Sequence, residues 1–136
     1  MSVAAYAKTN LTTETPTKTE YRLFAEITGE LEQVNKQAEV SQARVNALFR
    51  NSQLWLTLEA DLVSEQNKLD IELKAGLISL AIWVKKFTSS AMRTTIELEP
   101  LISVNRQIME GLLASERNAK NPSNRSTAVE YSQLQA

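Results

Sequence analysis

Acidic side chains two positions apart are the first candidates for chemistry, because two converging carboxylates can divide general acid and base work between them. Such pairs occur three times in the 136-residue chain, as Glu30/Glu32, Glu59/Asp61 and Glu97/Glu99. Two of the pairs fall in segments expected to be helical, where neighbours two positions apart point in different directions. We therefore interpret the pairs as solvated helix surface, and we expect no catalytic residue.

The residue types that are missing narrow the chemistry further. The chain contains neither Cys nor His, which excludes disulfides, thiolate nucleophiles, His-based triads and the usual zinc ligands. A small basic cluster of Lys85, Lys86 and Arg93 could hold an anion. Favourable charge near a helix C-terminus is the better explanation, so we expect no cofactor and no metal site.

Two asparagines interrupt apolar helical patterns and need an explanation. Asn51 lies among Leu48, Trp55 and Leu58, and Asn105 takes the same kind of position in the last predicted helix. Because a buried amide without partners costs a few kcal/mol, about 2–7 by transfer scales, each must bond to another helix, to a helix end or to a ligand. A structural role in fixing helix register is favoured over ligand binding, and we expect Asn105 to be buried.

Composition indicates one all-α domain. Hydrophobic residues make up 43% of the chain, whereas Gly and Pro each occur only 3 times, which is too few for the many turns of an all-β fold. The net charge of −1 gives no electrostatic basis for binding nucleic acid or an anionic membrane. The most apolar stretch, 77–84, is shorter than a membrane span, and no secretory signal is visible, so a cytoplasmic protein is expected.

Hydrophobic periodicity predicts a small bundle of about four helices, at 18–38, 41–64, 69–92 and 100–115. Thr17 and Glu20 have the spacing of a capping box at the first helix. Ser41 is a plausible N-cap of the second, and Pro100 suits the first turn of the fourth.

The helices define the expected domain organisation. Residues 1–17 are predicted to be a flexible N-terminal arm, 18–115 the helical domain and 116–136 a flexible polar tail. Residues 20–115 carry 10 basic and 13 acidic side chains, hence −3, whereas residues 1–19 and 116–136 carry +1 each.

The third predicted helix is apolar on two sides. Its main stripe contains Leu69, Leu73, Leu77, Leu80, Val84 and Phe87, with Trp83 on one flank. A second stripe falls on nearly the opposite side and contains Ile71, Ala75, Ile78 and Ile82. A helix that is apolar on two faces is either central to a bundle or covered by a partner.

An ordered set of short motifs resembles the FlaF family of flagellar biosynthesis regulators from alphaproteobacteria. The motifs cover about 1–114 and include Asn51 to Trp55, the segment 78–84 around Trp83, and Asn105 to Leu112. Tyr6, the segment 20–23, Asn67-Lys68-Leu69 and Pro100-Leu101-Ile102 complete the set. One departure is Asp70, where the family usually has Pro as the first helical residue, and the tail is longer than is usual.

The resemblance implies a cytoplasmic, non-enzymatic factor needed for flagellin production and filament assembly, functioning alongside the negative regulator FlbT. On this basis the first hypothesis is a flagellin-binding secretion chaperone, because a helical groove can hold an amphipathic segment by its spaced apolar anchors. The candidate partner-binding residues are Ile71, Ile78 and Ile82, followed by Trp55, Trp83 and Met109. The alternative is a post-transcriptional regulator that acts on flagellin mRNA directly or through FlbT, against which the acidic body argues.

Overall fold

Four α-helices make up the part of the chain that the computed structural model describes, which is residues 15–37 and 39–120. They are α2 (Pro16–Asn35), α3 (Gln42–Val63), α4 (Ile71–Ala91) and α5 (Glu99–Lys120). No strand occurs within these residues, so the predicted all-α class is confirmed. Most of the predicted arm and tail falls on residues 1–14 and 121–136, which lie outside the described residues.

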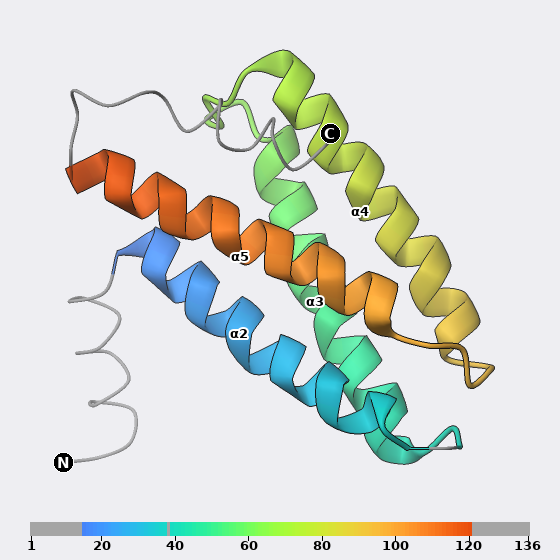
Figure 1. The fold of residues 1–136 in the computed structure, drawn as a ribbon. Coiled ribbons are helices and arrows are strands. Elements are labelled where there is room, and N and C mark those ends of the chain that lie inside the picture. The colour runs from blue at the N-terminus through green and yellow to red at the C-terminus, as the bar shows by residue number, and fades with distance from the viewer. Residues whose placement is uncertain (1–14, 38, 121–136) are drawn as a thin grey trace, which may run out of the picture.

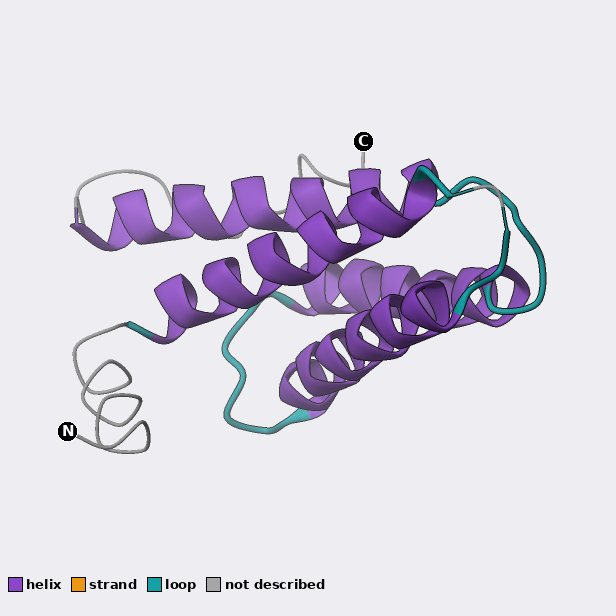
Figure 2. Ribbon diagram, turned by 90° about the horizontal axis from the view of Figure 1, so that it is seen from below, coloured by secondary structure: helices purple, strands orange, loops and turns teal. Residues whose placement is uncertain are grey.

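The helices form two layers. α2 lies beside α5, α3 lies beside α4, and α2 also packs against α3 (Figure 1). Figure 2 shows the α2–α5 pair stacked over the α3–α4 pair. The core fills the space between the layers and includes Phe24, Leu48, Trp55, Leu77 and Ile108, each at most 2% exposed. α4 therefore forms an edge of the bundle, with most of its packing on one side.

Two of the predicted helix starts are displaced. α2 begins at Pro16, and its N-cap is Thr15, whose side chain accepts a hydrogen bond from the Lys18 amide at 3.1 Å. The capping box expected at Thr17 is therefore wrong, because Pro16 already has the backbone angle of a first helical residue. Asp70 is the N-cap of α4 and accepts from the Glu72 amide, so α4 starts two residues later than predicted.

The helix ends differ from the predictions in both directions. α2 stops at Asn35 rather than 38, and the Asn35 side-chain oxygen accepts a hydrogen bond from the Leu98 amide at 2.8 Å. α5 continues to Lys120 rather than ending near 115. Ala114 is buried at the predicted end, and the polar residues that follow it can extend the helix on its solvent side. α3 starts after its predicted cap, Ser41, and ends at Val63, as expected.

The buried side of α4 is rotated relative to the predicted stripe. Leu73, Leu77 and Val84 are buried as expected, but Leu80 and Phe87 are only half-buried. Ala81, Thr88 and Ala91 take the remaining inward positions. Small side chains there let α4 approach its neighbour closely, which periodicity based on large hydrophobic residues does not reveal.

Candidate functional site

The second apolar stripe of α4 remains on the surface. Ile71 is 79% exposed and Ile82 is 44% exposed, Ala75 is exposed, and Ile78 is half-buried against the core. We refer to these four residues as the isoleucine face. α4 buries its opposite side against the bundle, so Ile71, Ala75 and Ile82 form apolar helix surface that stays exposed within the described residues, and Ile78 lies where this surface meets the core. Such clustered exposed apolar residues are characteristic of interaction sites.

A row of exposed hydrophobic residues on α3 continues this surface. The predictions from the sequence did not include these residues. Phe49, Leu56 and Val63 are 55%, 51% and 66% exposed. Their spacing of seven places them on one side of α3. That side is next to α4, because Glu59, which falls on an adjoining strip of α3, forms an ion pair with Lys85 of α4 at 3.2 Å. The seven-residue spacing could have indicated this row in the sequence, but the segment contains many other leucines that obscure the pattern.

The remaining partner-binding candidates do not join the isoleucine face. Trp55 is 2% exposed and belongs to the core, where its ring meets that of Phe24 edge to face with the ring centroids 5.9 Å apart. It therefore does not line a surface groove, and its indole N–H donates to Asn105 inside the bundle. Met109 of α5 is half-buried against the core. Trp83 is 36% exposed and stacks on Phe87 at 5.1 Å, about 120° around α4 from the isoleucines.

A buried polar network occupies the middle of the bundle. Asn105 of α5 donates from Nδ2 to Asn51 Oδ1 at 2.8 Å and to Thr28 Oγ1 at 3.1 Å. Its Oδ1 accepts a hydrogen bond from Trp55 Nε1 at 2.8 Å. Both asparagines are 0% exposed, so Asn105 is buried and bonded across helices as the sequence predicts. The network joins α2, α3 and α5, whereas Asn51 Nδ2 has no hydrogen-bond partner among the described residues.

A buried guanidinium, which sequence analysis did not identify, holds the connection between α4 and α5. Arg44 of α3 is 1% exposed. It donates to the carbonyl oxygens of Ala91, Thr94 and Ile96 at 3.1, 3.0 and 2.7 Å. Burial lowers the pKa of Arg44, and the nearby charge of Glu97 raises it. The position of Arg44 among hydrophobic residues of a predicted helix could have indicated from the sequence that its side chain is buried.

Most of the acidic candidates have structural partners. Arg50 pairs with Glu26 and Glu30, and the hydrogen bond to Glu30 raises the Arg50 pKa. Arg106 pairs with Glu32 and Glu99. Lys85, part of the basic cluster, pairs with Glu59. These exposed ion pairs stabilise the fold by about 0–1 kcal/mol each and tie neighbouring helices together.

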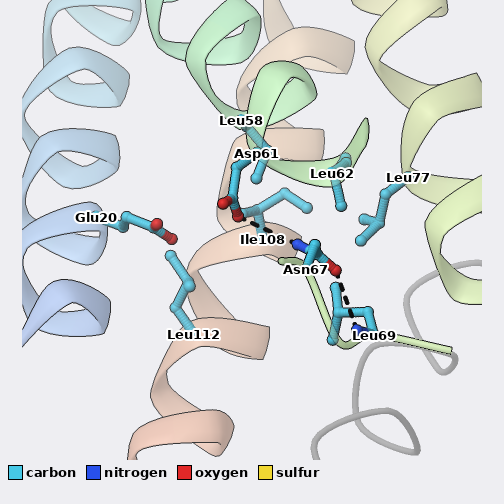
Figure 3. A pocket seen from close by; sticks show the side chains of 9 residues that line it. All are labelled: Glu20, Leu58, Asp61, Leu62, Asn67, Leu69, Leu77, Ile108 and Leu112. Carbon is cyan, nitrogen blue, oxygen red and sulfur yellow. Dashed lines mark hydrogen bonds between the residues drawn. The ribbon is translucent and has the colours of Figure 1, made fainter. Parts of the chain in front are cut away.

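One small cavity combines apolar walls with unpaired carboxylates. It has a volume of about 70 Å³, which is smaller than the roughly 300–1,000 Å³ of a typical small-molecule site. Figure 3 shows that the carboxyl groups of Glu20 and Asp61 point toward each other across it. The lining residues come from all four helices and the α3–α4 connection: Glu20, Leu58, Asp61, Leu62, Asn67, Leu69, Leu77, Ile108 and Leu112.

Within residues 15–37 and 39–120, no group of three or more acidic side chains is arranged to hold a metal ion. None of the helices in those ranges is both long and apolar enough to cross a membrane.

Comparison with known proteins gives one match. The family model described as "Flagellar protein FlaF" matches residues 2–112, which is most of the chain and includes α2, α3, α4 and the isoleucine face. Neither the curated proteins nor the solved structures contain a significant match to this chain.

Proposed function

The chain belongs to the FlaF family of flagellar proteins, and from this premise we propose that it is needed for flagellin production and filament assembly, binding flagellin as a secretion chaperone. The observation that carries the proposal is the isoleucine face, with Ile71 and Ile82 exposed on a helix that is buried on its other side. Such surface offers spaced apolar contacts to an amphipathic helix of a partner.

Exposed hydrophobic residues on α3 support a site wider than one helix. Phe49, Leu56 and Val63 lie along the side of α3 that is next to α4. An amphipathic segment lying along the α3–α4 pair can contact both rows at once, with anchors three, four or seven residues apart. The Glu59–Lys85 ion pair, which bridges the two helices, supplies polar groups beside the apolar contacts, as is common in protein interfaces.

The proposed test is copurification and titration of flagellin with a double variant, Ile71→Glu/Ile82→Glu. Both side chains are exposed, so the fold is expected to remain intact while binding weakens about tenfold or more. Leu113→Glu is the matched control, because Leu113 is 43% exposed, like Ile82, but lies on α5 in the other layer. A double variant that folds normally and binds flagellin unchanged assigns the binding to another surface.

Ile78→Glu tests the same face with one change, but its readout requires a stability control. Ile78 is half-buried and packs against the core, so a charge there also destabilises the domain. Comparing its thermal midpoint with that of the double variant separates loss of fold from loss of contact.

The competing hypothesis is post-transcriptional control of flagellin synthesis through direct RNA binding or through FlbT. Two arginines that could contact phosphate, Arg50 and Arg106, are each paired with two glutamates, and residues 20–115 carry 10 basic against 13 acidic side chains. RNA binding needs free basic surface and stacking aromatics, so we rank this function second. Tight, salt-sensitive retardation of flagellin leader RNA by the purified protein reverses the ranking.

A further inference from the structure

We propose that the cavity between Glu20 and Asp61 is a binding site for a lysine side chain presented by a protein partner. The site is distinct from the isoleucine face and does not require that the partner be flagellin. It lies near the start of α2, where Glu20 stands, and the end of α3, where Asp61 stands. The proposal rests on the shape of the cavity, on the chemistry of its walls and on the pairing of its carboxylates.

The walls and the mouth of the cavity have different chemistry. Leucines from three helices, including Leu62, Leu77 and Leu112, form apolar walls that suit methylene groups. The carboxylates of Glu20 and Asp61 come from two different helices and converge at the mouth. A volume of about 70 Å³ admits the tip of one side chain. Lysine combines an apolar stem with a compact ammonium head that carries three donors, which matches both parts of the cavity.

The carboxylates at the mouth differ from most others on α2 and α3 in having no cation. Glu26, Glu30, Glu32 and Glu59 all pair with an arginine or lysine of the described chain. Glu20 and Asp61 form no such pair within the described residues. Two facing carboxylates repel each other, and a cation between them removes that repulsion. The unpaired charge is therefore complementary to an ammonium group from outside.

Asp61 is already oriented for this role. Its Oδ2 accepts a hydrogen bond from Asn67 Nδ2 at 3.2 Å, and Asn67 Oδ1 accepts one from the Leu69 amide at 3.0 Å. The connection between α3 and α4 thus holds the Asp61 carboxylate at the mouth. Burial raises the pKa of Glu20, and the charge of Asp61 raises it further. A bound ammonium group offsets the second effect, because it compensates the negative charge of Asp61.

The probe for the test is n-butylammonium, which reproduces the end of a lysine side chain, with n-butanol as the uncharged control. Methyl NMR spectra of the full chain report on Leu62, Ile108 and Leu112. We expect saturable shifts of these methyl groups with n-butylammonium and at least about tenfold weaker binding of n-butanol. Equal binding of the two probes, or the absence of saturable shifts at these residues, overturns the proposal.

The decisive variant is Glu20→Gln/Asp61→Asn. Asparagine keeps an oxygen that can accept the Asn67 hydrogen bond, and the loss of two repelling charges favours folding. We expect n-butylammonium affinity to fall about tenfold, whereas the control Glu110→Gln on α5 leaves it unchanged. Retained affinity in the double variant overturns the site.

Two further measurements test whether the cavity accepts a lysine side chain of a protein and whether it is independent of the isoleucine face. Nα-acetyl-lysine amide must shift the same methyl groups, since a cavity that takes only the free amine is not a site for a protein side chain. Ile71→Glu/Ile82→Glu must leave amine binding unchanged, so failure of the cavity site and failure of the flagellin proposal are distinguishable.

Discussion

The side-chain nitrogen of Asn105 lies 2.8 Å from the side-chain oxygen of Asn51, and this hydrogen bond joins α5 to α3 at a point sealed from solvent. The two amides are not equivalent. Asn105 uses its oxygen and its nitrogen for three bonds, which reach Asn51, Thr28 and Trp55. Asn51 accepts one bond, and its own side-chain nitrogen finds no partner in the part of the chain that the structure describes. Asn105 is therefore the centre of the network, and Asn51 lies at its edge.

Asn105→Leu is expected to destabilise the domain by about 1–3 kcal/mol. The substitution leaves three buried polar groups without their partner, on Thr28, Asn51 and Trp55. Urea unfolding followed by circular dichroism measures the change in the free energy of unfolding. An unchanged midpoint together with lost flagellin binding would instead identify Asn105 as a contact residue.

Asn51→Leu is expected to cost less than Asn105→Leu under the same conditions. It removes one hydrogen bond, but it also removes an amide nitrogen that is buried without a partner, and an unsatisfied buried group itself destabilises the folded state. Equal losses for the two variants would contradict the assignment of Asn105 as the centre of the network.

Arg44→Met is expected to destabilise the fold by about 3 kcal/mol and to loosen the connection between α4 and α5. Three carbonyl oxygens lose a charged donor, and a hydrogen bond to a charged group contributes about 1.5–3 kcal/mol net. Water can replace part of this loss, because two of the three bonds are only partly buried. Arg44→Lys should recover only part of the loss, because an ammonium group cannot reproduce the forked geometry of a guanidinium. Hydrogen exchange at 92–98 reports the local loosening.

Glu20→Gln is expected to weaken the pH dependence of stability in the acidic range. The folded-state pKa of Glu20 is raised above its ordinary value of 4.5, so the native state binds more protons than the unfolded state between the two values. Stability from this group therefore falls as the pH rises from about 4.5 through the folded-state pKa. The variant should match or exceed the natural chain at neutral pH, by roughly 0.5 kcal/mol or less because Glu20 is partly exposed.

Measurement of urea midpoints between about pH 4.5 and about pH 7 checks this prediction. Glu110→Gln is the control, since its carboxyl is exposed on α5. A Glu20→Gln profile that parallels that of the natural chain would show that Glu20 does not carry the shift.

Tryptophan fluorescence can identify which side of α4 a partner covers. The chain has two tryptophans, and Trp55→Phe leaves Trp83 as the only one. This change also removes the hydrogen bond from Trp55 to Asn105, so binding is measured at a temperature where circular dichroism shows that the variant is folded. Trp83 is 36% exposed and lies about 120° around α4 from the isoleucine face. Flagellin bound at the isoleucine face should leave Trp83 emission and acrylamide quenching nearly unchanged. A large blue shift on binding would assign the contact to the Trp83 side instead.

The sequence by itself determined the fold class and most of the helices. Repeating apolar positions and the cap Ser41 predicted α3 to within a residue at each end, because amphipathic spacing and end capping are local properties. The same reasoning placed Asn105 inward and separated the two apolar stripes of α4. The start of α2 and the end of α5 were less predictable. α2 begins at Pro16, two residues before its predicted start. α5 continues past its predicted end, and Ala114 near that end is buried against the rest of the bundle.

Only the tertiary structure decided which apolar and polar residues meet. Periodicity shows that Trp55 and Ile82 lie on apolar stripes, but not that a neighbouring helix covers one and leaves the other exposed. Arg44 reaches carbonyl groups about 50 residues away in the chain, and Glu20 faces Asp61 from another helix. These relationships depend on how four helices pack together, and no local pattern encodes the distance between side chains on different helices.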